Sequence, residues 1–396
     1  MGLDTSTPVL LLGGQENALA VARHLGSHGI AVRVSGTASC MAMRSRYCRQ
    51  SFPVPPGRSA DTYWNELLLP PGNGSLHGHI VFACNDEAIE FMADHHRELE
   101  EHYLLDDSVP EIQHAMLDKM RTLELARAAG VPVPNFWKIR SIADAERLRG
   151  EVVFPVMVKP ILSHKFFRVF GRKLFIIEDS FDELVQKVRL AHEHGMAVMV
   201  VEMIPGPDDL TSSYYTYIDG SGRTLLHLTK RVVRRHPVNR GGACYHITEW
   251  LPETAELGRK FFEGIRFRGL GIIEFKRDPR DGQLKVIEVN PRFTAPHRLI
   301  VNVGAPIDLI IYCHLTGQPR PQFDQYEQFR RMLYPLHDFL AFRQLRARGE
   351  LSFLGWLRSI LHRRTDFPVW SLSDPMPAIV HTVQLLRRIK EATDGN

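Results

Sequence analysis

The sequence predicts an α/β plus α+β protein of about two to three domains, and three observations indicate this class. The chain has 396 residues, more than one hydrophobic core usually organises. Near its start, an apolar strand runs into a glycine pair and is followed by a helix and a second strand, as in a β-α-β unit. Farther along, two strands with charged residues on one face flank an Asp-Pro-Arg-Asp-Gly turn, which is typical of an antiparallel hairpin.

The first segment, residues 1–105, is expected to be a Rossmann-like β-α-β domain. Its Gly13-Gly14 pair follows a strand, as does the turn that holds the pyrophosphate of a dinucleotide. The pair lacks the G-x-G-x-x-G spacing, and Glu16 would place negative charge beside a phosphate, so NAD(P) oxidoreductase chemistry is the weaker alternative. Asn85-Asp86-Glu87 fits a plain helix cap best. The expected elements are strands at 8–12, 30–35 and 80–84, and helices at 17–28 and from 87.

The middle of the chain, residues 106–320, alternates between helical and extended patterns. Gly130 and the Val-Pro-Val-Pro run after it end a predicted helix. A small α+β unit is expected at about 155–200. The expected elements are helices at 116–129, 181–194 and 253–265, and strands at 213–219, 223–229 and 245–250.

Polar side chains line one face of the predicted strand at 284–292. Because side chains alternate along a strand, Glu288, Asn290 and Arg292 share a face. It is costly to shield a carboxylate, an amide and a guanidinium on one face of a strand from water unless a charged group lies beside them. The guanidinium can fork onto a phosphate or carboxylate oxygen, a geometry that lysine cannot supply.

The strand at 270–276 is expected to pair with this one. A hairpin centred near Asp281 places Glu274 opposite Glu288. Opposed carboxylates repel across a ladder by roughly 0.2–1 kcal/mol, and a divalent cation removes that repulsion. Two carboxylates and the amide of Asn290 form an oxygen-only set, which suits Mg²⁺ or Mn²⁺ holding the phosphates of a nucleotide.

This hairpin resembles the metal-binding end of the ATP-grasp fold, and further motifs of that family follow in its order. The family carries one lysine before its small mobile lid and one within it, and Lys119 and Lys159 occupy those places. Its adenine hinge usually consists of apolar residues, an acid and Ile-Pro-Gly, as at 199–206 here. The resemblance spans roughly 106–320. It implies an ATP-grasp fold behind the N-terminal domain, with the unit at 155–200 as the lid.

The resemblance also implies a role for each matching residue. The carbonyl of Glu202 and the amide of Ile204, with Met203 between them, would face adenine. Asp208, or alternatively Asp209, would reach the ribose hydroxyls. The resemblance places Lys119 and Lys159 at the ATP phosphates and Arg292 beside the γ-phosphate. It implies that the metal is held by Glu274, Glu288 and Asn290.

A site for ATP and Mg²⁺ that has no Walker A loop, but has an arginine able to donate two hydrogen bonds to one group, suits phosphorylation of a carboxylate. The resemblance implies a carboxylate–amine ligase that acts on small, amino-acid-like substrates and releases ADP and phosphate. In the D-aspartate ligase-like subgroup an arginine before Pro and Gly helps hold a carboxylate, and Arg234 fits best within the basic stretch 230–242. A solvated basic turn is the alternative for that stretch. A kinase acting on a hydroxyl, or a nucleotide-binding protein without turnover, stays open as an alternative function.

The lid departs from the family pattern at residues 163–173, which hold one glycine where the phosphate-covering loop is often glycine-rich. This stretch either covers the nucleotide with Lys and Arg side chains or forms a hairpin tip with its phenylalanines packed beneath. Lys173 is similar to a basic residue that some members keep at the start of the following strand.

Composition excludes several other classes. A net charge of +4 is too mild to predict a nucleic-acid partner. The five cysteines are scattered without metal spacing, as in a reducing compartment. No signal-like segment or run of ~20 apolar residues is evident, so a cytoplasmic protein is expected.

The last segment, residues 321–396, is expected to be mostly helical and basic. Between 342 and 364 it holds six arginines and one glutamate, a local charge of 6 − 1 = +5, interleaved with apolar residues. Such an amphipathic segment either rests on anionic lipid as a peripheral membrane contact or docks its apolar face on its own core. Docking is the commoner arrangement.

Overall fold

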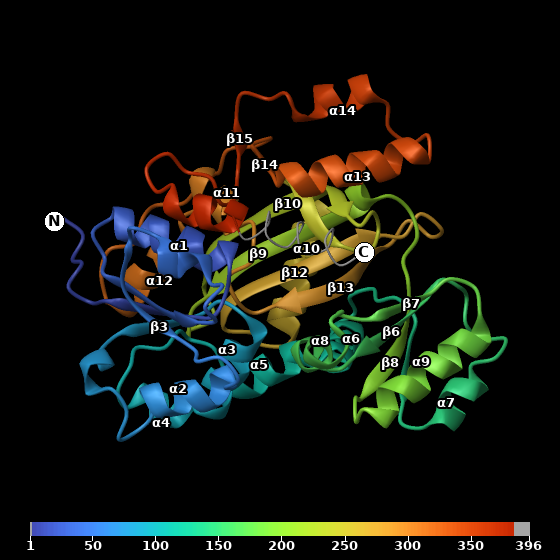
Figure 1. Ribbon diagram of the computed structural model, residues 1–396, viewed down its shortest axis with the longest axis horizontal. Helices are drawn as coiled ribbons and strands as arrows, with labels where there is room; N and C mark the ends of the chain where they lie inside the picture. Colours follow the sequence, from blue (N-terminus) through green and yellow to red (C-terminus); the bar gives the residue numbers. More distant parts are fainter. Residues whose placement is uncertain (1, 384–396) are drawn as a thin grey trace.

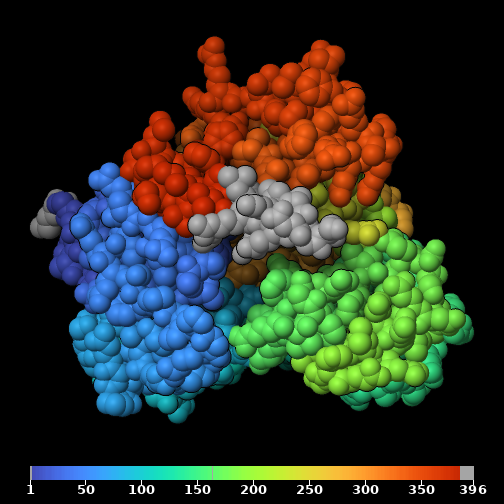
Figure 2. Space-filling view, viewed as in Figure 1, coloured from blue at the N-terminus to red at the C-terminus, as the bar shows by residue number. Residues whose placement is uncertain are grey.

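The computed structural model describes residues 2–383, which form three β-sheets with helices around them (Figure 1). The N-terminal sheet, the lid sheet and the large central sheet occupy separate regions of the molecule. In the space-filling view, the surface is hollowed between the N-terminal region and the lid, which also contact each other (Figure 2). The elements that border this hollow therefore determine which side chains can form a site.

The N-terminal region is a parallel sheet with helices packed on it. Its elements are β1 (Val9–Leu12), α1 (Glu16–Ser27), β2 (Val32–Gly36), β3 (Cys48–Pro53), α2 (Ala60–Leu68), β4 (Ile80–Ala83), α3 (Asp86–Asp94) and α4 (His96–Glu100). The strand order is β3-β2-β1-β4, and every pair is parallel. The predicted β-α-β opening is confirmed, since β1 is followed by α1 and pairs in parallel with β2, and β1 and β4 are buried apolar strands as expected. The polar edge strand β3 was not predicted, because its residues are mostly exposed.

The glycine turn after β1 is filled by protein groups. Gly13 and Gly14 have φ of 70° and 84°, a region that favours glycine. A Cβ on Gly14 would lie 2.5 Å from that of Cys84. The Asn17 amide donates to the carbonyls of Cys84 at 2.6 Å and Phe293 at 2.8 Å. The glycine pair thus permits close packing between the N-terminal region and the chain after β13 (Leu284–Asn290).

The helix predicted at 116–129 is wrong in its boundaries, because Asp118 divides this region into α5 (Pro110–Leu117) and α6 (Lys119–Ala128). The backbone of Asp118 is extended, and its carboxylate accepts hydrogen bonds from the amides of Met120 at 2.9 Å and Arg121 at 2.8 Å. Periodicity alone could not reveal this interior cap. The break places Lys119 in the first turn of α6 with its side chain buried.

The lid is a second, smaller α+β unit. Its elements are β5 (Phe136–Ile139), α7 (Ile142–Arg147), β6 (Val156–Pro160), α8 (Ser163–Phe170), β7 (Phe175–Ile177), α9 (Phe181–Glu193) and β8 (Val198–Glu202), with strand order β5-β8-β6-β7. The stretch expected as a loop or hairpin tip is the helix α8. Phe166 packs against Phe170 and Phe175 with ring centroids 4.5 and 5.2 Å apart. Phe166 and Phe170 therefore pack beneath this segment, as one of the two interpretations proposed, whereas Phe167 is exposed.

The central sheet has seven strands. They are β9 (Thr211–Ile218), β10 (Thr224–His236), β11 (Gly242–Thr248), β12 (Gly269–Arg277), β13, β14 (Arg331–Leu333) and β15 (Thr365–Asp366), in the order β13-β12-β9-β10-β11-β14-β15. The predicted register is confirmed, because Glu274 pairs with Glu288 across β12 and β13. The basic stretch 230–242 was wrongly expected to be a loop. Residues up to 236 continue β10, with register shifts between Val232 and Arg235, and only the short turn 237–241 is irregular.

Helices cover the central sheet and lead to its far edge. They are α10 (Pro252–Gly264), α11 (His297–Asn302), α12 (Ile307–Leu315), α13 (Pro335–Ala347) and α14 (Phe353–Ile360). The C-terminal segment is helical as predicted, but it also adds β14 and β15 to the sheet. These strands of three and two residues are too short to leave a pattern in the sequence. Within residues 2–383, no helix combines the length and apolar character needed to cross a membrane, and the end of the predicted C-terminal segment, 384–396, lies outside the described residues.

Candidate active site

The polar residues of β13 lie in file at the end of the strand, as alternation predicts. Asn290 donates to a carboxylate oxygen of Glu288 at 3.1 Å and accepts from the Arg292 guanidinium at 3.1 Å. Glu274 lies across the ladder from Glu288, and its carboxylate accepts from Arg235 at 3.2 Å. The structure thus brings the four hairpin residues named from the sequence to one place.

Lysines neutralise the carboxylate of Glu288. Burial opposes its ionisation, but Lys119, Lys159 and Lys173 outweigh burial and lower the pKa of Glu288 to about 2. Lys159 donates to the carbonyl of Ile287 at 3.3 Å. Burial lowers the pKa of Lys159 to about 8, although the two carboxylates of the hairpin act in the opposite direction. Both predicted phosphate lysines therefore face the hairpin.

Arg292 is held from the N-terminal region. Its Nε donates to Asp86 at 2.6 Å, and its Nη1 donates to the Phe293 carbonyl at 3.3 Å. Burial opposes ionisation of Asp86, but Arg292 and then Lys119 reverse the effect and hold the pKa of this carboxyl well below its usual range. Asn85 caps α3 as predicted, accepting from the Ala88 amide at 2.9 Å. The role of Asp86 was missed, because its partner lies 206 residues away in the sequence.

The lid helix α8 also contacts α3. Glu90 accepts from His164 at 2.9 Å and from Lys165 at 2.8 Å, and Glu87 pairs with Arg168. The basic side chains of this segment therefore pair with the N-terminal region in this structure.

The predicted adenine hinge lies where β8 leaves the lid. The Met203 amide donates to the Pro155 carbonyl at 3.1 Å, and the Glu202 carboxylate pairs with Arg280. The Ile204 carbonyl accepts from Lys276 at 3.0 Å. Within residues 2–383 the Ile204 amide donates no hydrogen bond, so this donor is available to a ligand.

Asp208 has a structural role that the sequence did not indicate. Its buried carboxylate accepts from the backbone amides of Arg235 at 3.0 Å and Asn239 at 3.1 Å. Both oxygens are thereby engaged in fixing the end of β10 and the turn after it. Asp209, the competing choice for the ribose, is exposed.

Arg234 does not point towards the metal hairpin, and the choice of this arginine needs correction. Its guanidinium is buried and donates to Asp338 at 2.6 and 3.1 Å and to Ser359 at 3.0 Å. Arg235 is the arginine of β10 that contacts Glu274. Consecutive side chains of a strand point to opposite sides, and the register shift in β10 decides that Arg235, not Arg234, lies on the side of Glu274.

Three further polar residues on the central sheet were not predicted. Lys230 is fully buried and donates to Ser213 at 3.0 Å, and burial lowers its pKa to about 8. Both ring nitrogens of buried His246 and the hydroxyl of Tyr334 have no hydrogen-bond partner in the described part of the chain. Buried polar atoms without partners are uncommon and costly, so they mark a place where a ligand or water completes the structure. No sequence signal distinguishes His246 from an ordinary core histidine.

The residues present fit a hard divalent cation. Two opposed carboxylates and an amide oxygen supply the ligand type that Mg²⁺ prefers, and Mg²⁺ usually takes its remaining ligands from water and nucleotide phosphates. Within residues 2–383, no cluster of three or more His, Cys, Asp or Glu residues suits a metal. The site thus suits a cation that arrives with a nucleotide better than a permanently held one.

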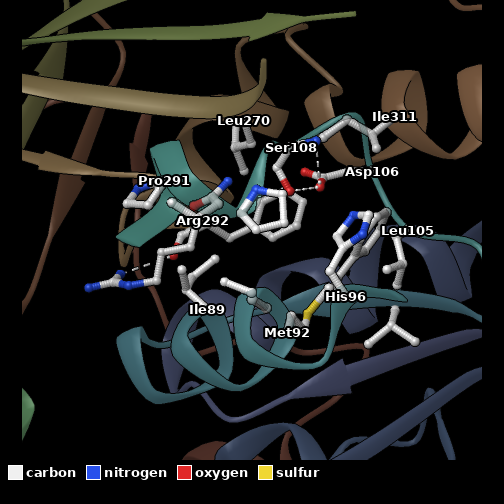
Figure 3. Close-up of a pocket in the computed structure, with 17 residues that line it drawn as sticks. Ile89, Met92, His96, Leu105, Asp106, Ser108, Leu270, Pro291, Arg292 and Ile311 are labelled. Carbon is white, nitrogen blue, oxygen red and sulfur yellow. Dashed lines mark hydrogen bonds between the residues drawn. The ribbon is translucent and has the colours of Figure 1, made fainter. Parts of the chain in front are cut away.

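A small cavity lies behind Arg292, as Figure 3 shows. Its volume is about 30 Å³, enough for about two water molecules. Ile89, Met92 and Leu270 form apolar walls, and the Asp106 carboxylate accepts from Ser108 at its edge. Its size excludes a nucleotide.

Comparison with known proteins agrees with this geometry. No protein-family model matches the chain. The chain is 24% identical over 298 residues to the D-aspartate ligase of Enterococcus faecium, an alignment that covers 72% of this chain and 70% of that protein.

Solved structures show the same fold. The N5-carboxyaminoimidazole synthetase of Staphylococcus aureus in complex with ADP matches with a TM-score of 0.62 and 15% identity, covering 88% of this chain and 87% of that one. The biotin carboxylase of Campylobacter jejuni in complex with β,γ-ATP matches with a TM-score of 0.63 and 17% identity, covering 81% and 74%. These matches confirm the predicted ATP-grasp fold and the predicted resemblance to carboxylate–amine ligases.

Proposed function

We propose that this ATP-grasp protein is an ADP-forming ligase that uses ATP and Mg²⁺ to activate a carboxylate as an acyl phosphate and join it to an amine. The observation that carries the proposal is the hairpin of β12 and β13. Its opposed carboxylates, Glu274 and Glu288, lie among lysines of the N-terminal half and beside Arg292. The D-aspartate ligase relative supports the same reaction class.

We assign the nucleotide contacts as follows. The free Ile204 amide, with the backbone of Glu202 and Met203, would hold adenine. Lys119 and Lys159 would hold phosphate oxygens, and Arg292, kept in place by Asp86, would lie beside the γ-phosphate. Glu274, Glu288 and Asn290 would hold Mg²⁺, whose charge neutralises the oxygens of the transferred phosphoryl group.

In the proposed reaction, a carboxylate oxygen of the substrate attacks the γ-phosphorus and ADP leaves. The amine nitrogen then attacks the acyl carbon, phosphate leaves, and the amine gives up a proton. The lid excludes water, which would otherwise hydrolyse the acyl phosphate. Fixed positive groups that face the transferred oxygens supply most of the rate enhancement expected of such a site.

We place the organic substrates over the central sheet beside Arg235. Its guanidinium contacts Glu274, and buried Lys230 lies in the same row of side chains across β9 and β10. His246 and Tyr334 offer unpaired polar atoms on the neighbouring strands. Positive charge together with unpaired hydrogen-bonding groups supports a small polar substrate with an anionic group, such as an amino acid. We also propose that the protein acts in the cytoplasm and is divided into domains at 1–105, 106–320 and 321–396.

The experiment that tests this function measures ADP release with Mg²⁺ over a panel of amino acids and small carboxylates, with hydroxylamine as the trap. Formation of a hydroxamate with one acid identifies the activated substrate. Omitting the acid, and separately the metal, gives the matched controls. ADP release that requires a hydroxyl compound, yields no hydroxamate and does not respond to any amine would indicate a kinase instead.

A further inference from the structure

Helices α13 and α14 form an arm, defined here as residues 335–364, on the edge of the central sheet away from the lid (Figure 1). Buried polar contacts fix its base. Asp338 of α13 accepts from Arg234 and also from the indole of Trp356 at 2.9 Å. The Ser359 hydroxyl accepts from Arg234, and the Ser359 carbonyl accepts from Tyr245. The arm is therefore held in one orientation by the sheet.

The outer face of the arm is apolar and exposed. A helix that docks on its own core buries a stripe of residues, but no residue of α14 is fully buried. Phe353, Leu354 and Leu361 are 49%, 62% and 68% exposed. Stacking of Trp356 on Phe342, with ring centroids 4.6 Å apart, supports this face from beneath. The docking alternative therefore holds for Trp356, which packs on α13, but not for Phe353, Leu354 and Leu361, which remain exposed.

Positive charge is concentrated in the same stretch of the chain. The stretch 342–364 carries a charge of 6 − 1 = +5, whereas the whole chain carries +4, so the remainder has a net charge of 4 − 5 = −1. Arg364 pairs with Glu327 at 2.7 Å. The other arginines of the stretch form no ion pair with any residue from 2 to 383, and all are exposed; they are Arg343, Arg346, Arg348, Arg358 and Arg363.

We propose that the arm binds the surface of an anionic lipid bilayer, inserting Phe353, Leu354 and Leu361 at the level of the headgroups. Exposed apolar side chains in one short segment with exposed arginines that form no ion pair are complementary to a surface that is apolar within and negatively charged outside. An acidic protein surface would match the charge but would leave the three apolar side chains in water. The rigid base holds the apolar face outward, so little conformational order is lost on binding. This proposal does not depend on the ligase reaction.

Sedimentation of the full chain with vesicles tests the proposal directly. The probes are vesicles of phosphatidylcholine alone and vesicles in which about one-third is phosphatidylglycerol. We expect binding to the anionic vesicles only, and release when the salt concentration is raised.

Two double variants separate the apolar and the electrostatic contributions. Arg358→Gln with Arg363→Gln should lower the partition coefficient about 25-fold, which corresponds to about 1 kcal/mol for each charge. Leu354→Ser with Leu361→Ser should abolish sedimentation while leaving the circular dichroism spectrum unchanged. Val153→Ser is the matched control, because Val153 is 60% exposed but lies in the lid, and its binding should equal that of the unmodified chain.

Other outcomes would overturn the proposal. Equal binding to both kinds of vesicle would remove the electrostatic argument, and binding to neither would remove the membrane as partner. If sedimentation velocity instead shows a dimer that the leucine substitutions dissociate, a second copy of the chain covers this face.

Discussion

The ion pair between Arg234 and Asp338 provides the sharpest test of the conclusion that Arg234 of β10 holds the arm in place and does not contact a substrate. Both side chains are almost completely buried, and the guanidinium forks onto the carboxylate at 2.6 and 3.1 Å. In the Asp338→Ala variant the guanidinium would stay buried without its counter-charge. Breaking a buried pair in this way costs about 3–5 kcal/mol, because the remaining charge has lost the partner that compensated its desolvation.

The loss should be confined largely to the arm, because Asp338 also holds Trp356, whereas no hydrogen bond or ion pair within residues 2–383 joins the side chains of this network to the metal hairpin. Hydrogen exchange measured by mass spectrometry is the suitable assay. We expect faster exchange across residues 335–360 and unchanged exchange across β12 and β13. ATP affinity should not change.

The variant that combines Arg234→Met with Asp338→Leu is the control, because an apolar pair of similar volume often matches or exceeds the stability of a buried ion pair. This double variant should restore the protection of the arm's backbone amides from hydrogen exchange, although the hydrogen bond donated by Trp356 remains lost. If Asp338→Ala leaves exchange in the arm unchanged, the network does not hold the arm. If the double variant restores protection but raises the KM of the acid, Arg234 contacts the substrate and the original assignment stands.

Four other predictions concern the active site and the N-terminal region. Glu288→Gln should abolish turnover and leave the fold intact, because it removes one of the two charges opposed to the metal; near-normal activity would refute the metal assignment. Lys159→Ala should weaken ATP binding in a nucleotide titration without changing the KM of the acid. Arg235→Lys keeps the positive charge but cannot donate two parallel hydrogen bonds to a carboxylate. The KM of the acid should therefore rise about ten- to hundred-fold, equivalent to about 1.5–3 kcal/mol, and the KM of ATP should rise less. The contribution of His24 to stability should be lost as pH rises above about 6.5: burial lowers the pKa of His24, but Asp308 at 2.7 Å outweighs it and raises the pKa, so protonated His24 stabilises the fold below its unfolded pKa and this contribution is lost above its folded pKa. Urea titrations at several pH values should show this dependence in the unmodified chain and not in Asp308→Asn.

The hairpin could be predicted from the sequence because the information it uses is local. Alternation along a strand fixes which side chains share a face, and the turn at 278–282 fixes which residue of β12 meets Glu288. The β-α-β opening was predictable for the same reason, since each element carries its own apolar pattern. The ATP-grasp resemblance then followed from the order and spacing of short motifs.

Features that depend on distant partners could not be predicted. The carboxylate that holds Arg292 belongs to Asp86, and those that pair with the lid belong to the same helix, α3. A bulge in β10 decides which arginine faces the site, and its position is set by pairing with β11 rather than by the residues of β10 alone. The strands β14 and β15 exist only because the central sheet offers an edge for them.

The contacts of α3 have consequences for how the lid can move. The pairs from Glu87 and Glu90 to the lid join side chains that are partly exposed, and such pairs contribute about 0–1 kcal/mol each. Arg292, which pairs with Asp86, makes two further hydrogen bonds within its own strand end. Motion of the lid therefore breaks weak contacts and leaves the arginine in place. An arginine fixed from outside the lid can face the same phosphate position before and after the lid closes, which is what pre-organised stabilisation of a transferred phosphoryl group requires.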